Sequence, residues 1–310
     1  MSAPHASSYL ALAASGELRQ RARLAQRALA DCCLCPRQCH ANRTGGVLGY
    51  CRAGILPRVA SCNVHRWEEP PVSGSEGSGT IFFSHCTARC RFCQNYPISQ
   101  LASGKEVTPE RLGGMMLELQ RMGCHNINLV TPTHYVPQIL TAVAEASAHG
   151  LHIPLVYNTS GYDSVKTLRW LDGIVDIYLP DSKYADDKAA AHISGYRGYV
   201  AANRDALKEM FRQVGDALEL GEHGIARRGM IIRHLVLPQG LSQTRAVLGW
   251  IAENLSNQLH ISLMSQYYPA WHAVGDADLG RPLNIDEYQE ALDALETFGF
   301  EQGWQQELDG

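Results

Sequence analysis

Three cysteines stand close together in the spacing Cys86-x3-Cys90-x2-Cys93, directly after an apolar run at residues 81–83. Thiolates are the ligands of iron–sulfur clusters, and a cubane cluster is usually held by four of them. Three thiolates on one tight loop can therefore hold three irons and leave the fourth iron open. An open coordination position is where metal chemistry takes place, as it is at catalytic zinc. The alternatives are three buried structural cysteines, or three ligands of a zinc site that is completed elsewhere.

A second set of cysteines precedes the first. Its members share the spacing C-x2-C-x3-C-x11-C and are Cys32, Cys35, Cys39 and Cys51. Four thiolates suit either a tetrahedral structural zinc or a [4Fe–4S] cluster. The segment has few large apolar side chains, so it needs a metal or a cross-link to hold its shape. We expect a second metal site here, zinc or iron–sulfur, which either relays electrons or docks the N-terminal segment. The spare Cys33 and Cys62 are interpreted as small buried fillers.

The composition is that of an ordinary globular protein. The 310 residues are 45% hydrophobic and 19% charged, which suits one large domain or two smaller ones. A net charge of −4 argues against a nucleic-acid partner held by bulk electrostatics. We expect no signal peptide and no membrane span, because no apolar run approaches the ~18 residues that a span needs. We therefore expect a cytoplasmic protein, in which clustered cysteines indicate metal rather than disulfides.

The elements that must position the cysteines alternate between strand and helix. Short apolar runs bounded by turn residues predict strands at 80–83, 125–130, 153–157, 174–179, 230–237 and 259–264. Helical patterns follow them, beginning at Thr108 and near 137–148, 164–171, 204–214, 243–254 and 285–298. Repeated βα units with right-handed crossovers predict an α/β fold, a (β/α)6 partial TIM barrel. Chemistry in such barrels sits at the C-terminal ends of the strands, where the cysteine loop stands.

An N-terminal extension precedes the barrel. An amphipathic pattern at residues 8–30 predicts one packing helix, with Leu18, Ala22, Ala25 and Leu29 on one face. We predict two units: residues 1–72, with this helix and the cysteine-rich metal-binding segment, and residues 73–310, the core domain.

The cysteine loop, with Phe92 before its last cysteine, resembles the signature of radical S-adenosylmethionine (SAM) enzymes over about residues 73–270. More narrowly, the chain resembles the pyruvate formate-lyase-activating-enzyme-like group, which activates glycyl radical enzymes. The matching stretches are Cys32–Arg37, Trp67–Pro70, Phe92–Asn95, Asn126–Tyr135 and Asn158–Tyr162.

The resemblance implies roles for individual residues. Cys86, Cys90 and Cys93 would bind the catalytic [4Fe–4S] cluster, whose fourth iron the amino and carboxylate groups of SAM would occupy. Further cofactor-binding positions are Phe92 near the adenine, Asn158 and Ser160 on the ribose side, and Asp181 with Lys183. An ammonium such as that of Lys183 makes a charge-assisted contact with a carboxylate.

Other positions are candidates from the residues themselves. Arg233 is added to the cofactor-binding set, because a charged residue in a strand buried on both faces needs a partner or a cavity. His234 and Gln266 are weaker candidates. The family's Gly-Gly-Glu is absent after the second strand, where Thr131, Thr133 and His134 stand as candidates for holding the SAM amine.

The resemblance implies an oxidoreductase. One electron from the cluster would cleave SAM to methionine and a 5′-deoxyadenosyl radical, which abstracts hydrogen from a glycine of a glycyl radical enzyme. The implied partners are SAM, an electron donor such as flavodoxin or ferredoxin, and a protein substrate. Two alternatives stay open: radical modification of a small molecule or peptide, and a non-enzymatic iron–sulfur electron-transfer or metal-binding protein.

Overall fold

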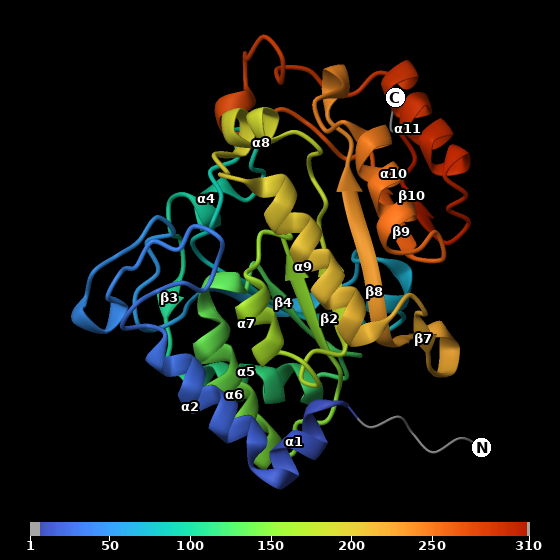
Figure 1. Cartoon of the computed structure of the whole chain (residues 1–310). Coiled ribbons are helices and arrows are strands. Elements are labelled where there is room, and N and C mark those ends of the chain that lie inside the picture. Colours follow the sequence, from blue (N-terminus) through green and yellow to red (C-terminus); the bar gives the residue numbers. More distant parts are fainter. Residues whose placement is uncertain (1–6, 309–310) are drawn as a thin grey trace.

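The computed structural model describes residues 7–308, and its centre is a twisted, mostly parallel sheet (Figure 1). The parallel strands are β2 (Ser78–Phe83), β4 (Ile127–Val130), β5 (Leu155–Thr159), β6 (Ile177–Pro180), β8 (Ala226–Leu235), β9 (His260–Met264) and β10 (Gly303–Gln305). The antiparallel strands are β1 (Arg58–His65), β3 (Lys105–Glu106) and β7 (Glu219–Leu220). The order is β10-β9-β8-β6-β5-β4-β2-β1-β3, with β7 beside β8, so the sheet is open.

Helices follow the predicted strands and cover the outer face of the sheet. The longer ones are α5 (Pro109–Arg121), α6 (Val136–Ala148), α7 (Val165–Trp170), α8 (Asp187–Ser194), α9 (Tyr199–Val214), α10 (Thr244–Asn254) and α11 (Ile285–Thr297). Short helical turns are α3 (Pro70–Ser73) and α4 (Tyr96–Ser99). The predicted α/β partial barrel is confirmed, and the first βα unit carries the cysteine loop.

The chain before the barrel differs from the expectation. The helix predicted at 8–30 is two helices, α1 (Tyr9–Ser15) and α2 (Glu17–Arg27), because Gly16 turns the chain with φ +80°. Leu18, Ala22 and Ala25 of α2 are buried against α6, as their spacing predicts. The strand β1 was not predicted; it pairs antiparallel with β2 and places the N-terminal segment beside the first barrel strand.

The inner face of the barrel is apolar at one end and polar at the other. Side chains alternate along each strand, so Val156 lies on the same face as Asn158, and Ile231 on the same face as Arg233. The apolar layer combines strand residues with Val72 of the short helix α3. Its members are Val72, Val156, Ile177, Leu179, Ala226 and Ile231. The polar layer lies toward the C-terminal ends of the strands, where the cysteine loop begins.

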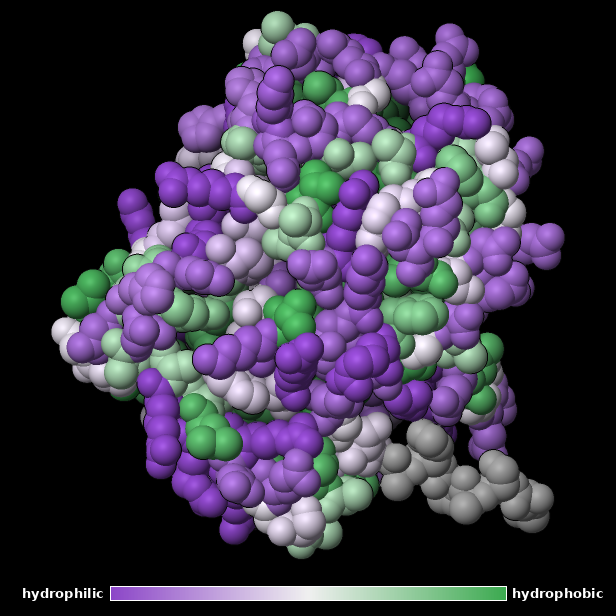
Figure 2. Space-filling model, in the orientation of Figure 1, coloured by the Kyte–Doolittle hydropathy of each residue, from purple (hydrophilic) through white to green (hydrophobic). Residues whose placement is uncertain are grey.

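The surface is mostly hydrophilic on the face seen in Figure 2, with hydrophobic residues in small scattered groups. Within residues 7–308 no helix is long and apolar enough to cross a membrane.

Candidate active site

The cysteine loop leaves β2 and is fixed by backbone hydrogen bonds to the end of α8. The amides of Arg89 and Arg91 donate to the carbonyl oxygens of Ser194 (2.8 Å) and Ile193 (2.9 Å). Cys86 Sγ accepts a hydrogen bond from the Ala88 amide at 3.4 Å, and Cys93 Sγ lies 3.1 Å from Ser99 Oγ. The loop is therefore a shaped unit held by α4 and α8.

The three sulfurs of this loop fit a cluster better than a single ion. A tetrahedral ion with bonds of about 2.3 Å places its sulfur ligands ~3.8 Å apart. In the part of the chain that the structure describes, the one group of three metal-binding side chains within 4.8 Å of one another is Asp31, Cys33 and His40. At least one pair of the sulfurs of Cys86, Cys90 and Cys93 is therefore more than 4.8 Å apart, which is wider than a single tetrahedral ion requires and is compatible with the separate iron corners of a cubane.

Burial disfavours the charged form of these thiols in the free protein. It raises the pKa of Cys86 to about 11 and that of Cys90 to about 12. Both residues nevertheless keep part of their surface accessible, although they pack against the core. A bound metal deprotonates such thiols outright.

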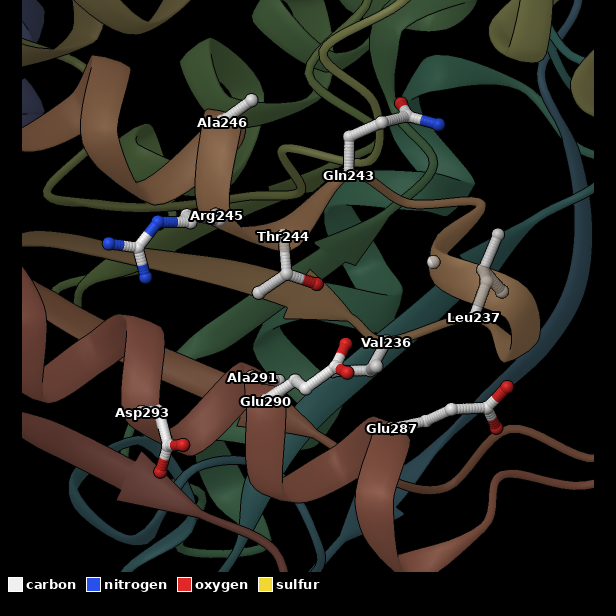
Figure 3. A pocket seen from close by; sticks show the side chains of 11 residues that line it. Val236, Leu237, Gln243, Thr244, Arg245, Ala246, Glu287, Glu290, Ala291 and Asp293 are labelled. Carbon is white, nitrogen blue, oxygen red and sulfur yellow. The ribbon is translucent and has the colours of Figure 1, made fainter.

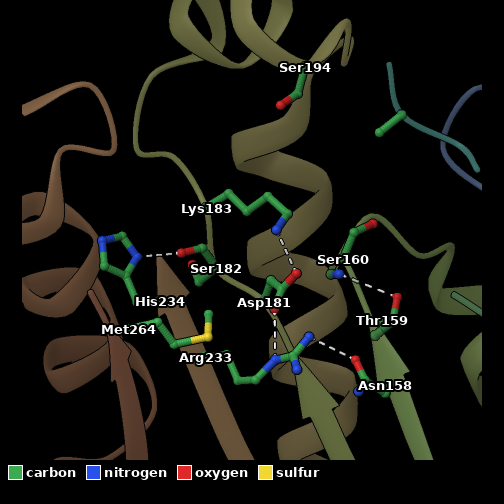
Figure 4. A network of polar contacts seen from close by, with 12 residues as sticks. Asn158, Thr159, Ser160, Asp181, Ser182, Lys183, Ser194, Arg233, His234 and Met264 are labelled. Atoms are coloured by element: carbon green, nitrogen blue, oxygen red, sulfur yellow. Dashed lines mark hydrogen bonds and ion pairs between the residues drawn. The ribbon is translucent and has the colours of Figure 1, made fainter. Parts of the chain in front are cut away.

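A buried ion-pair network lies at the ends of β5, β6 and β8 (Figure 4), with Lys183 close enough to Cys90 for the two to interact electrostatically. Sheet register pairs Asp181 with Arg233, whose Nε donates to Asp181 Oδ1 at 2.9 Å. Lys183 Nζ lies 2.6 Å from Asp181 Oδ2, and Arg233 Nη2 donates to Asn158 Oδ1 at 2.8 Å. The predicted residues Asn158, Asp181, Lys183 and Arg233 are therefore brought together.

The charges in this network stabilise one another. Burial raises the pKa of Asp181, but Arg233 and Lys183 outweigh it and hold the pKa below the usual range. Burial lowers the pKa of Lys183, and Asp181 and then Cys90 outweigh it, so the net shift is upward. An anion that displaces one of these contacts would meet a preformed cationic site.

Glu68 joins the network and was missed by sequence reasoning. Its Oε1 accepts from Asn128 Nδ2 at 3.0 Å, and its Oε2 lies 3.7 Å from Arg233 Nη1. Burial raises the pKa of Glu68 to about 7, against the lowering effect of Arg233. The sequence did contain a signal for Glu68, because it lies in the stretch Trp67–Pro70 that resembles the family. That resemblance did not suggest a role for the residue.

The remaining candidates have structural partners. Phe92 is buried edge-on against Tyr267, and Ser160 accepts from Tyr199 through its carbonyl oxygen. His134 is buried with Nε2 2.9 Å from the Ser84 carbonyl oxygen, where it supports the start of the cysteine loop. His234 points away from the network, to Thr244 and the Ser182 carbonyl oxygen.

The turn after β4 has an unusual backbone. Thr131 has φ +59°, which a β-branched residue rarely adopts. Thr133 Oγ1 lies 3.3 Å from Thr159 Oγ1 at the end of β5. The chain thus adopts a glycine-like turn at this position without the glycine.

A large groove opens next to the cysteine loop. It has a volume of about 1170 Å³, and Gln94, the neighbour of Cys93, lines it together with Gln266, Tyr268 and Ile285. Gln94 Nε2 donates to the Gln266 carbonyl oxygen at 3.0 Å, which joins the groove to the loop. A smaller pocket of about 450 Å³ lies between α10 and α11 (Figure 3), and none of its lining residues belongs to the loop or the network.

The N-terminal cysteine segment rests on the cysteine loop. Arg37 Nε donates to the Thr87 carbonyl oxygen at 2.7 Å, and Arg37 Nη2 donates to Gly195 at 2.6 Å. From the other side, Arg89 Nη2 donates to the Tyr50 carbonyl oxygen at 2.8 Å. Cys33 is partly exposed beside His40, so it is not the buried filler that the sequence suggested.

Comparisons with known proteins agree with this geometry. The family model of the radical SAM superfamily matches residues 80–233. An uncharacterised protein of Methanocaldococcus jannaschii is 29% identical over 288 residues, which are 90% of this chain and 78% of that protein.

Two solved structures of HydG, a maturase of [FeFe]-hydrogenase, superpose with TM-scores of 0.51 and 0.50 at 12% identity. The second is from Carboxydothermus hydrogenoformans. The matches cover 73% and 71% of this chain and half of each HydG chain, so the likeness concerns the fold alone. The chain belongs to the radical SAM superfamily, which implies an enzyme that uses a [4Fe–4S] cluster and SAM.

Proposed function

We propose that this protein is a radical SAM enzyme of the glycyl-radical-enzyme-activating type, with Cys86, Cys90 and Cys93 as the cluster ligands. The observation that carries the proposal is the position of this loop, at the C-terminal end of the first parallel strand and beside the Lys183–Asp181–Arg233 network. Chemistry in βα barrels takes place at that end of the strands.

The family chemistry defines what these residues must do. A reduced cluster of this kind supplies one electron that breaks the C5′–S bond of SAM, giving methionine and a radical that abstracts hydrogen from the substrate. Lys183 would bind the SAM carboxylate, while Asn158, Ser160, Asp181 and Arg233 would line the ribose side and Phe92 the adenine. Their buried contacts hold the site in shape and exclude water.

The groove beside Gln94 supports a polypeptide substrate. Small-molecule sites are about 300–1,000 Å³, and the groove of about 1170 Å³ lies close to the upper limit of this range, with room for a polypeptide segment. A protein loop carrying a glycine would fit there, next to the site of the radical. A small molecule or short peptide is the second candidate. Membership in an enzyme superfamily weighs against the third, a non-enzymatic electron carrier. The electron donor would be a flavodoxin or ferredoxin.

The test is anaerobic reconstitution with iron, sulfide, SAM and dithionite, followed by measurement of 5′-deoxyadenosine. We expect its formation by the wild type and none by Cys90→Ala. Equal product from both proteins would overturn the assignment of the cysteine loop. Deuterium transfer from a glycine-labelled protein, compared with labelled small molecules, then separates the two substrate classes.

Lys183 allows a sharper test of SAM binding. Lys183→Met removes the ammonium but leaves Asp181 paired with Arg233. A hydrogen bond to a charged group contributes about 1.5–3 kcal/mol, so we expect the Kd for SAM to rise about tenfold or more. Calorimetry on the reconstituted protein measures this, with the exposed Lys188→Met as the matched control. An unchanged Kd in Lys183→Met would exclude the contact.

A further inference from the structure

The four cysteines of the N-terminal segment converge on one place. A bridge between Cys32 and Ala41 folds the segment back on itself, and Cys39 Sγ lies 3.8 Å from the Cys32 carbonyl oxygen. The turn Gly49–Arg52 then brings Cys51 close enough to Cys32, Cys35 and Cys39 for electrostatic interaction between the thiols. Cys32, Cys35 and Cys51 are buried, whereas Cys39 is exposed. All four are free thiols.

Few apolar contacts within this segment hold it together. Its own apolar cluster contains only four buried residues, Leu29, Cys32, Leu34 and Ala41. A cluster of this size contributes little stability, and small units of this kind are held by disulfides or metals. The Cys39 sulfur lies directly against Gly49. A Cβ at this position would lie 2.5 Å from Cys39 Sγ, so a larger residue would displace the sulfur. The segment is thus shaped around its cysteines.

The separation of the sulfurs favours a cluster over a single zinc ion. A tetrahedral zinc site requires its sulfurs about 3.8 Å apart. Within residues 7–308 no three cysteine sulfurs lie within 4.8 Å of one another. In the N-terminal set, as in Cys86, Cys90 and Cys93 where the family implies a cubane, every trio of sulfurs therefore contains at least one pair that is more than 4.8 Å apart. The chain also has a compact group, Asp31, Cys33 and His40, which shows that closer packing of ligands occurs in the same segment.

We propose that Cys32, Cys35, Cys39 and Cys51 bind a second [4Fe–4S] cluster. With four thiolates its coordination is complete, so it leaves no iron for SAM, and its role is electron transfer to the cysteine loop. The electron-transfer role rests on the proposed function, whereas the identity of the metal centre does not. One electron enters from a donor of the ferredoxin or flavodoxin class and leaves to the cluster at Cys86–Cys93, and no bond is made or broken.

The contacts between the two segments supply a short path. Arg37 follows Cys35 by two residues and donates to the carbonyl oxygen of Thr87, the neighbour of Cys86. The guanidinium of Arg37 also lies 3.4 Å from the centre of the Tyr50 ring, which precedes Cys51. A second connection is aromatic. The Arg37 guanidinium lies 5.7 Å from the centre of the Tyr162 ring, and the Tyr162 and Tyr196 ring centroids are 4.7 Å apart. The two cysteine sets are therefore connected through contacting side chains.

The experiment uses the full chain with Cys86, Cys90 and Cys93 all changed to Ala. After anaerobic reconstitution we expect about four irons and about four sulfides per chain, with visible absorbance that dithionite bleaches. The wild type should hold about twice these amounts. A protein without sulfide overturns the proposal. So does one that holds about one zinc, if Cys35→Ser removes that zinc and His40→Ala does not.

Three further variants keep the test independent of misfolding. Cys39→Ala, made in the triple variant, changes an exposed side chain and should remove most of the iron while circular dichroism is unchanged. Gly49→Ala should lower iron content because its Cβ meets Cys39 Sγ, whereas Gly54→Ala, with nothing within 4 Å, should not. Full iron in Cys39→Ala would contradict the ligand set. Iron and sulfide in the triple variant, with no 5′-deoxyadenosine from the wild type, would overturn the proposed function alone.

Discussion

Arg233 links the charged and polar side chains on the inner face of the barrel. It contacts Asp181, Asn158 and Glu68, which come from three different segments of the chain. The sequence predicted that a charged residue in a buried strand needs a partner. It could not name Glu68, because that residue comes from the loop between β1 and α3, whose position is set by packing under the barrel.

Glu68 should make stability depend on pH. Burial raises its folded-state pKa to about 7, above the unfolded value near 4.5. Between these values the folded state binds more protons than the unfolded state, so stability falls as pH rises through this window. The loss should be on the order of 2 kcal/mol between pH 5 and pH 7.5. Urea unfolding at several pH values measures it.

The matched variants separate Glu68 from other acids. Glu68→Gln keeps an oxygen for Asn128 and removes the titration, so the slope between pH 5 and pH 7.5 should become shallower. The exposed Glu296→Gln should leave the slope as it is in the wild type. A slope that persists in Glu68→Gln would assign it to another group.

At the scale of elements, the βα units were predictable and the N-terminal segment was not. The six predicted barrel strands are buried apolar runs, and helices such as α5 and α11 have side-chain caps at Thr108 and Asn284. By contrast, β1 is half-buried and carries polar residues such as Ser61 and Asn63, so no apolar alternation marked it. Pairing between Asp181 and Arg233 depends on register between β6 and β8, which sequence alone does not fix.

Arg37 tests how the N-terminal segment is docked. Arg37→Met removes two hydrogen bonds, to Thr87 and Gly195, and keeps much of the packing on Tyr50. We expect a loss of about 2 kcal/mol in the free energy of unfolding. Slower formation of 5′-deoxyadenosine with a reduced ferredoxin as donor should accompany it.

The exposed Arg27→Met, at the end of α2, is the control for loss of a charge. If both variants unfold at the same urea concentration, Arg37 does not dock the segment.

At the scale of the whole molecule, positive charge gathers around the cysteines of a chain with net charge −4. Arg52 follows Cys51 and Arg89 precedes Cys90, whereas Arg91, which follows Cys90, is paired with Asp276. Burial, and after it the charges of Arg58, Arg89, Arg43 and Arg52, together lower the pKa of His85, next to Cys86, to about 4. This local excess of positive charge is what an acidic electron-transfer protein would recognise, because complementary charge steers association.

Reduction by such a donor should therefore depend on salt and on Arg52. Raising ionic strength from about 0.05 to 0.5 M shortens the Debye length and should slow cluster reduction by a reduced flavodoxin or ferredoxin several-fold. Arg52→Glu should do the same at low salt, with little change in iron content, because the Arg52 side chain is exposed. Arg245→Glu, exposed on α10, makes the same change in net charge elsewhere. Stopped-flow absorbance measures both. Equal slowing in the two variants would mean that net charge matters and that the arginines around the cysteines do not form the docking site.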